Sequence, residues 1–269
     1  MMAQDTKKQF TFSQSKEAVS IKASHVEKMF GNRTVLRDID LFVEPGEIFV
    51  LMGPSGTGKS VFLRLLAGLD FPTKGTLTID NQPIERIKKE QSLVLGLVFQ
   101  SGALFNSLTV LDNLALYLRE HRIYSEEEII KRVYAMLDML GLQASTAQQM
   151  PSNLSGGMRK RVALARGLLM EPDVLLFDEP TSELDPITSA SIIELIGYVN
   201  KQFNITTFIV SHDITLAKSI GQHIAILQNG TIKEICPPET LVQSKEEFVQ
   251  EFLNPTINLE HPKFLSRLS

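Results

Sequence analysis

The chain has 269 residues, of which 43% are hydrophobic and 22% charged, enough for one sizeable core or a core plus a subdomain. Its formal net charge of -4 shows no basic surplus of the kind that attracts nucleic acid, and the single cysteine, Cys236, excludes an intrachain disulfide. The most apolar runs, 48–52 and 174–177, are far shorter than the about 20 residues of a membrane-spanning helix, so any membrane role would depend on a partner.

The first part of the chain predicts strands around a glycine-rich loop. Residues 1–22 are polar, lack the apolar segment of a signal peptide, and are expected to form a loosely ordered extension. Alternating apolar and polar residues at 26–30 and 38–43 predict two half-buried strands joined by a turn at 31–33. The apolar run 47–52 predicts a strand buried on both faces, and a helix is expected after residue 60. Further strands are predicted at 75–80 and 92–99.

Between residues 100 and 157 the pattern changes and predicts a helical insert. A helical period runs over 108–119. Ser125 followed by three glutamates resembles a capping box, and it opens a helix that ends at Gly141. Pro151 is expected to interrupt the regular structure just before residue 154. The apolar face of the second helix is predicted to consist of Ile129, Ile130, Val133, Met136, Leu137 and Leu140.

The alternation of strands and helices then resumes. Buried strands are predicted at 174–177 and 206–210, with a helix at about 187–201 between them. Residues 223–228 and 231–235 flank Asn229-Gly230, the strongest short signal for a hairpin. Pro237-Pro238 ends that hairpin, a last helix is expected within 244–253, and the tail 254–269 has no strong period.

The glycine-rich loop has the spacing G-x4-G-K-S at residues 53–60, between a predicted strand and a predicted helix. Glycines there allow backbone N–H groups to surround phosphate oxygens, and the helix N-terminus adds positive potential. In this pattern Lys59 reaches the β- and γ-phosphates and Ser60 binds Mg²⁺. The predicted nucleotide-binding residues are Gly53, Pro54, Ser55, Gly56, Thr57, Gly58, Lys59, Ser60 and Val61.

Two adjacent carboxylates, Asp178 and Glu179, follow the apolar strand predicted at 174–177. Carboxylates at the edge of a parallel sheet are costly to bury unless they face a cation or transfer a proton. The simplest assignment places Asp178 beside Mg²⁺ and Glu179 beside the attacking water. A general base contributes about 10²–10⁴ in rate.

A second glycine-rich turn, Leu154-Ser155-Gly156-Gly157, lies between the phosphate loop and the two carboxylates. The order of these three motifs resembles that of the ATP-binding cassette (ABC) ATPases, in which this turn is called the signature. The resemblance covers residues 21–253 and leaves an extension at 1–20 and a tail at 254–269 outside it. It implies an α/β fold, in which a RecA-like P-loop NTPase core carries N-terminal antiparallel β strands and a helical subdomain at about 100–157. ATP, Mg²⁺ and ATP hydrolysis are implied with it.

The same resemblance implies roles for residues outside the phosphate loop. Gln100 is similar to a glutamine that senses Mg²⁺ and water and connects to a transmembrane partner. His212 is similar to a histidine that contacts the γ-phosphate, and Phe30 to an aromatic residue that stacks on adenine. The implied catalytic set is Glu179, His212, Gln100 and Lys59, and the implied Mg²⁺ set is Ser60, Gln100 and Asp178.

In ABC ATPases the signature of one subunit covers the ATP held by another, so Ser155, Gly156 and Gly157 are expected to bind ATP across a homodimer. Asp185 lies in Ser182-Glu183-Leu184-Asp185, which resembles the loop that joins the two sites. Met158 stands where the commonest signature has glutamine, and activity is expected to survive this departure. The basic residues 159–161 begin a helix, and at least two of the three are expected to be solvated rather than to contact phosphate.

Short stretches near the motifs narrow the resemblance to the ATPases of Mce-type lipid transporters, such as the Mla (maintenance of lipid asymmetry) system. They are 99–105, 118–121, 184–188 and Met158. This subgroup implies phospholipid transport through an integral permease with an Mce-domain lipid-binding partner. It places the ATPase peripherally on the cytoplasmic face of the inner membrane.

Two other interpretations remain open. The chain could serve a small-solute ABC importer, in which case neighbouring genes would encode a solute-binding protein instead of an Mce-domain protein. It could also be an ABC ATPase that acts on nucleic acid or ribosomes. Three features argue against this last interpretation, and no nucleic acid partner is expected. The chain has a single cassette, no long coiled-coil insertion and no basic surplus.

Overall fold

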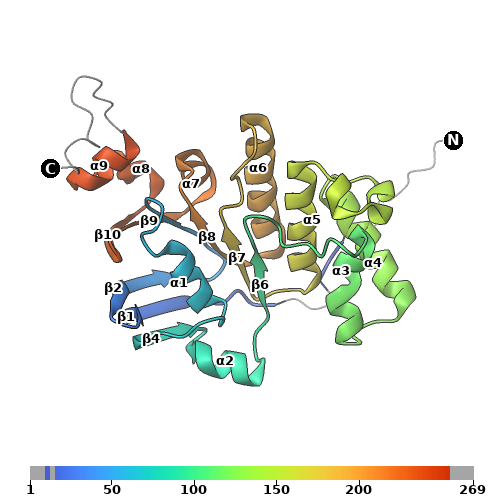
Figure 1. Cartoon of the computed structure of the whole chain (residues 1–269), viewed down its shortest axis with the longest axis horizontal. Helices are drawn as coiled ribbons and strands as arrows, with labels where there is room; N and C mark the ends of the chain where they lie inside the picture. The colour runs from blue at the N-terminus through green and yellow to red at the C-terminus, as the bar shows by residue number, and fades with distance from the viewer. Residues whose placement is uncertain (1–9, 13–15, 255–269) are drawn as a thin grey trace.

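The computed structural model describes residues 10–12 and 16–254. Two β-sheets and the helices around them form an α/β arrangement (Figure 1). The strands of the smaller sheet are antiparallel and have the order β2-β1-β4-β5. Their bounds are β1 Ile21–Phe30, β2 Arg33–Val43, β4 Lys74–Ile79 and β5 Gln82–Pro83.

The first two strands are longer than predicted, because register shifts interrupt the period that a simple alternation would show. His25 and Asp38 have φ values of 50° and 51°, and the β1–β2 register shifts between Ala23 and Val26. Such bulges turn side chains out of strict alternation. The predicted turn is confirmed at Gly31 and Asn32.

The larger sheet has the order β10-β9-β3-β8-β7-β6, and all neighbours except β10 and β9 run parallel. β3 is buried at every position, as its continuous apolar run predicts. β6 is shorter than the strand predicted at 92–99. The bounds are β3 Ile48–Met52, β6 Leu95–Val98, β7 Val174–Asp178, β8 Thr206–Ser211, β9 His223–Gln228 and β10 Thr231–Cys236.

The predicted hairpin is confirmed, because Asn229 and Gly230 both have positive φ, at 50° and 81°, as a tight hairpin turn requires. Between the two sheets, α1 (Lys59–Leu66) packs through Phe62 against Phe208 of β8, with ring centroids 5.6 Å apart. This contact fixes the helix that follows the phosphate loop on the face of the sheet.

The predicted helical insert contains α3 (Val110–Glu120) and α4 (Glu126–Met139), which lie beyond α5 (Gly156–Leu169) at one side of the molecule (Figure 1). Thr109 and Ser125 cap α3 and α4 by accepting from backbone N–H groups three residues on. The short 3₁₀ helices Ala144–Gln148 and Pro151–Asn153 lead into α5.

The remaining helices are α2 (Ile84–Glu90), α6 (Pro186–Phe203), α7 (Ile214–Ile220), α8 (Pro238–Leu241) and α9 (Glu247–Leu253). The prediction included α6 and α9 but not α2, α7 and α8, which have only one or two turns each. Helices this short show little of the 3.6-residue period, and α9, which is no longer than α2 or α7, was expected only within the wider range 244–253.

The expectation of a loosely ordered N-terminal extension is wrong for its described part. Phe10 is 4% exposed, and the Phe12 ring stacks on Phe203 at 4.3 Å between centroids. Lys16 donates to the carbonyl oxygen of Glu171 at 2.7 Å and pairs with Asp173 at 3.0 Å. This segment therefore packs against the core and α6, and the Arg132 guanidinium of α4 lies 5.8 Å from the Phe10 ring centroid. Residues 1–9, 13–15 and the tail 255–269 lie outside the described residues.

Across the described parts of the chain, none of the helices combines the length and the apolar character that crossing a membrane requires.

Candidate active site

The sheet topology brings the predicted site residues to one edge. β3, β8, β7 and β6 are neighbours and run parallel, so their carboxyl ends lie side by side. The phosphate loop follows β3, His212 follows β8, Glu179 follows β7, and Gln100 lies two residues after β6. Ligand sites of open α/β sheets form at this edge.

The phosphate loop begins at a position that only glycine can occupy. Gly53 has φ of 151°, and a Cβ added there would lie 2.2 Å from the carbonyl oxygen of Leu227 on β9. The loop backbone therefore passes directly against the neighbouring strand before it turns into α1.

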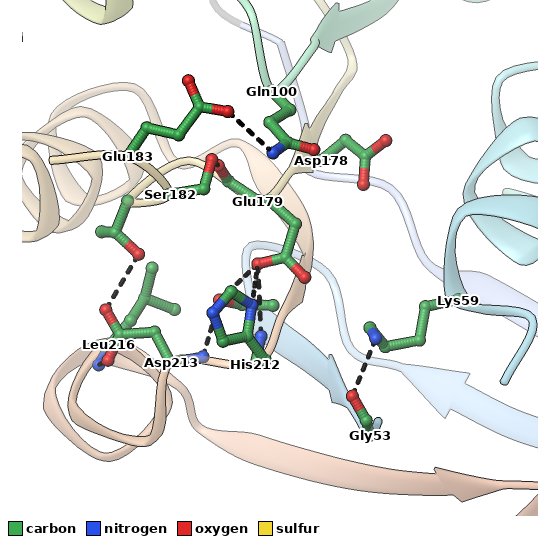
Figure 2. Close-up of polar contacts among 12 residues, drawn as sticks. Gly53, Lys59, Gln100, Asp178, Glu179, Ser182, Glu183, His212, Asp213 and Leu216 are labelled. Carbon is green, nitrogen blue, oxygen red and sulfur yellow. Dashed lines mark hydrogen bonds and ion pairs between the residues drawn. The ribbon is translucent and has the colours of Figure 1, made fainter. Parts of the chain in front are cut away.

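Lys59 points back into its own loop (Figure 2). Its ammonium group donates to the carbonyl oxygens of Gly53 at 2.7 Å and Pro54 at 3.0 Å, and the residue is only 7% exposed. Burial lowers the pKa of Lys59, while the nearby carboxylates of Glu179 and Asp178 oppose that shift. The loop thus holds a buried cation close to two anions.

Ser60 and Asp178 meet across the gap between α1 and β7. The Ser60 hydroxyl donates to Oδ1 of Asp178 at 3.2 Å. Burial raises the pKa of Asp178, with the Ser60 hydrogen bond acting against the shift. A hydroxyl and a carboxylate are oxygen donors of the kind Mg²⁺ prefers, so the pair fits the predicted metal role.

Both the backbone and the carboxylate of Glu179 have hydrogen-bond partners at the end of β8. Its φ is +49°, which is uncommon for a residue with a side chain, and its N–H donates to Val210 O at 2.9 Å. Its carboxylate accepts from Ser211 Oγ at 3.3 Å and lies 2.8 Å from Nδ1 of His212 (Figure 2). The two predicted catalytic side chains, Glu179 at 14% exposed and His212 at 64% exposed, therefore form a pair.

Gln100 lies farther from the phosphate loop. Its amide nitrogen donates to Oε1 of Glu183 at 3.4 Å, and both residues are exposed. The structure therefore brings Gln100 to the same edge as Asp178 (Figure 2) but pairs it with the loop after β7.

The signature turn occupies the start of α5. The Ser155 hydroxyl accepts from Met158 N at 3.3 Å and so caps the helix. A Cβ at Gly157 would lie 2.6 Å from the Thr188 methyl group on α6, so any larger residue here would force the contact between α5 and α6 to shift. Among the described residues, no hydrogen bond joins the signature turn to the phosphate loop of the same chain.

Two other predicted ligand-binding residues have structural contacts of their own. Asp185 caps α6 by accepting from the N–H groups of Ile187 and Thr188, each at 3.0 Å. Phe30 is 48% exposed, and the Lys28 ammonium lies 4.9 Å from its ring centroid. These observations leave both predicted roles as predictions.

A cavity of about 960 Å³ opens beside the phosphate loop. Phe30 is not among its lining residues, whereas residues that the sequence did not assign to the site are. Arg33 and Arg37 of β2, the hairpin turn at Asn229 and Phe248 of α9 line it together with Ser55 and Thr57. The sequence marked Asn229 only as a hairpin turn and gave no sign that it lies beside the phosphate loop, because these residues come from three separate elements that meet only in the folded chain.

The expectation that residues 159–161 form a solvated face is wrong for two of the three. Lys160 is 9% exposed and has three hydrogen-bond acceptors. Arg161 donates to Leu140 O at 2.9 Å and to Ser191 Oγ at 2.7 Å. Arg159 is exposed, as expected.

A family model for the ABC transporter matches residues 36–182, more than half of the chain. The chain belongs to the ABC transporter family. This match includes the phosphate loop, the signature turn and both carboxylates, so the residues that carried the resemblance lie within the shown family domain.

Relatives of this ABC ATPase span different transport systems. The probable ribonucleotide transport ATP-binding protein mkl of Mycobacterium tuberculosis is 40% identical over 240 residues, 88% of this chain and 67% of that protein. The intermembrane phospholipid transport system ATP-binding protein MlaF of Haemophilus influenzae is 37% identical over 227 residues, 83% of this chain and 86% of that protein.

Solved structures of ABC ATPases have the same fold as this chain. A dimeric post-hydrolysis state of the ATP-binding cassette MJ0796 bound to ADP and Pi has a TM-score of 0.73 and 34% identity, covering 81% of this chain and 98% of that one. The predicted α/β P-loop fold of an ABC ATPase is therefore confirmed, and the protein is an ATPase of this type.

Proposed function

We propose that this ABC ATPase uses Glu179 as the general base that activates water for attack on the γ-phosphate of ATP. The pairing of Glu179 with His212, at the strand end beside Lys59 and Asp178, is the observation that carries this proposal. A carboxylate held by a left-handed backbone and by Ser211 and His212 keeps one position during the reaction. Fixed geometry of this kind is the main source of rate in phosphoryl transfer.

The other predicted site residues take supporting roles in this proposal. Lys59 and the N–H groups of the phosphate loop bind the β- and γ-phosphates, and His212 contacts the γ-phosphate. Ser60, Asp178 and Gln100 would hold Mg²⁺, which neutralises charge on the phosphate oxygens when bound. Asp178 lies within 3.2 Å of the Ser60 hydroxyl, which supports this grouping.

We further propose that residues 21–253 act as an ATPase domain that works as a homodimer. The signature turn of one copy completes the site of the other, with Ser155, Gly156 and Gly157 facing the γ-phosphate and Asp185 near the junction. Two observations support this arrangement: among the described residues no hydrogen bond joins the signature turn to the phosphate loop of the same chain, and the chain is similar to a dimeric cassette. An integral permease would then hold the dimer peripherally on the cytoplasmic face of the inner membrane.

For cargo, we propose phospholipid transport of the Mce type, with an Mce-domain partner. The stretches 99–105, 118–121 and 184–188, together with Met158, support this assignment, and so does the 37% identity to MlaF. The alternative is small-solute transport, which the 40% identity to a probable ribonucleotide transport protein favours.

Glu179→Gln tests the assignment of the base. The amide keeps the shape and loses the proton acceptor, so we expect steady-state hydrolysis to fall about 10²–10⁴-fold. ATP binding, followed by equilibrium titration, should be retained, and the ATP-bound dimer should accumulate. Glu194→Gln, an exposed carboxylate on α6, serves as the control. Hydrolysis by Glu179→Gln within a few-fold of the wild-type rate would exclude Glu179 as the base.

Purification from membranes with native partners tests the cargo assignment. Copurification of an Mce-domain protein and phospholipid would support lipid transport, whereas a solute-binding protein in the complex would favour the alternative. A chain that stays soluble without any permease would contradict both assignments.

A further inference from the structure

Lys160 of α5 is a buried cation whose contacts all belong to the catalytic edge of the sheet. Its ammonium group donates to Gln100 O at 2.5 Å, to Glu179 O at 3.1 Å and to Ser182 Oγ at 3.4 Å. Three donors therefore meet three acceptors, which is the full capacity of a lysine ammonium.

The acceptors come from two separate turns. Gln100 belongs to the turn after β6, and Glu179 and Ser182 belong to the turn after β7. Ser182 also donates to Glu179 O, through its hydroxyl at 2.8 Å and its backbone N–H at 3.3 Å, so that carbonyl oxygen receives three hydrogen bonds in all. Lys160 is thus the side chain that joins the backbones of the proposed base and the proposed Mg²⁺-sensing residue.

Burial of this ammonium is costly. Burial lowers the pKa of Lys160, with the carboxylates of Glu183, Glu179 and Asp178 opposing the shift. An apolar residue of similar length would fill the same volume without that cost, because buried charges are often replaceable by packed apolar groups. The gain must therefore come from what the cation holds in place.

The helix that carries Lys160 begins with the signature turn. Ser155 caps α5, and Lys160 follows five residues later, about 7.5 Å along the helix axis. A short stretch of regular helix transmits displacement with little bending. A shift of the signature turn therefore moves Lys160 and, through its hydrogen bonds, both catalytic turns.

We propose that Lys160 is a positioning residue that holds the backbones of Gln100 and Glu179 at the spacing needed for hydrolysis and couples them to the signature turn of the same chain. This inference rests on the proposed function, in which the signature turn contacts the partner's ATP. It follows that each chain connects the ATP of its partner to its own base through α5.

Lys160→Met tests the proposal because methionine retains the length of the side chain and removes all three donors. We expect the kcat for ATP hydrolysis to fall about 10- to 100-fold, because displacements of about 1 Å at a site have effects of this size. The Kd for ATP should stay within about threefold of wild type, since none of the acceptors lies in the phosphate loop. Lys201→Met, an exposed lysine on α6, is the control and should leave both values unchanged.

Ser182→Ala provides a second variant that weakens the same contacts from the other side, with an expected loss in kcat of a few-fold. Values of kcat within twofold of wild type for Lys160→Met would overturn the proposal, and so would a loss of kcat matched by an equal loss of ATP affinity. If Lys160→Met fails to fold, Ser182→Ala tests the proposal instead, and an unchanged kcat in that variant would overturn it.

The Glu179→Gln variant separates the two levels of inference. A Lys160→Met/Glu179→Gln double variant should still form the ATP-bound dimer, measured by size-exclusion chromatography, because the proposed defect lies in hydrolysis. Absence of that dimer in the double variant alone would overturn the role of Lys160. Normal hydrolysis by Glu179→Gln itself would instead contradict the proposed function.

Discussion

The ionised side chain of Asp178 destabilises the folded chain. Burial raises the pKa of its carboxyl group, and Glu179 beside it raises it further, while Ser60, Lys59 and Lys160 act against the shift. The folded chain therefore holds a proton on this group more tightly than the unfolded chain. In its ionised form Asp178 lowers the free energy of unfolding, which is typical of residues kept for catalysis.

Asp178→Asn should therefore raise Tm at neutral pH while abolishing hydrolysis. The folded pKa lies above the unfolded value, so the ionised carboxylate destabilises the fold at pH values above both. As the pH falls through the folded pKa, the advantage of the Asp178→Asn variant over wild type should shrink, and it should vanish below the unfolded pKa of 3.8, where both states are protonated. Thermal melts between pH 4 and 8 measure this, with an expected gain of a few degrees.

Glu194→Gln is the matched control, because it removes an exposed carboxylate and should leave Tm unchanged across the same pH range. A melting temperature of Asp178→Asn equal to or below that of wild type at pH 7 would show that the interactions of the ionised carboxylate outweigh its burial.

At the level of single residues, motifs could be recognised in the sequence, but the contacts between distant residues could not. The spacing of 53–60 was sufficient to place Lys59 and Ser60, because the chemistry requires that pattern. Lys160 looked like one of three solvated basic residues, since neither its type nor its neighbours reveal that Gln100 and Glu179 lie within reach. Those two residues are brought together by the pairing of β6 with β7, which a local pattern does not encode.

Among the elements, the N-terminal segment ties the core to the helical region. Phe10 packs within the main core cluster, and the Arg132 guanidinium of α4 lies 5.8 Å from its ring centroid. Arg132 also pairs with Glu171, whose backbone carbonyl accepts from Lys16. The segment thus contacts α4, α6 and the connection into β7, although it lies outside the family match, which begins at residue 36.

Phe10→Ala should lower the free energy of unfolding by about 3 kcal/mol, because truncation of a buried phenylalanine loses both transfer energy and packing. The loss appears as a shift in the midpoint of chemical denaturation. Phe42→Ala, on the 48% exposed phenylalanine of β2, is the control and should cost well under half as much. Equal effects of the two substitutions would mean that the segment contributes no more than a surface strand does.

Elements with a strong local signal were predictable, and those shaped by tertiary contacts were not. Helix α4 has a capping serine, a full apolar stripe and a terminating glycine, so its limits follow from its own residues. The residues around Phe10 and Phe12 are polar and show no helical or strand period. The two phenylalanine rings pack against Phe203, which lies nearly two hundred residues away in the sequence. Long-range partners of this kind are absent from any window of the sequence.

For the whole molecule, the central prediction is that one chain cannot complete a site. The signature turn caps α5 and packs against α6, whereas the phosphate loop packs against β9. The prediction is therefore that each chain carries two half-sites on different elements. A twofold dimer would bring the halves together twice, since a self-complementary interface repeats every contact.

Mixing two inactive variants tests this directly. Lys59→Ala removes the cation that we propose binds phosphate, and Ser155→Gly removes the signature hydroxyl. Glycine is chosen over alanine because Ser155 caps α5, and glycine at a cap costs only a few tenths of a kcal/mol. In a mixed dimer, the phosphate loop of the Ser155→Gly chain meets the signature of the Lys59→Ala chain, so one site is intact. Random 1:1 mixing should restore about a quarter of the wild-type sites.

Each variant measured by itself provides the baseline, and affinity tags of two kinds identify the mixed dimers. Hydrolysis should rise from the baseline in proportion to the mixed population. If tagged mixed dimers form at every ratio and remain as inactive as the parents, the signature turn does not act in trans. The coupling through Lys160 would then have to operate within a site completed by a single chain.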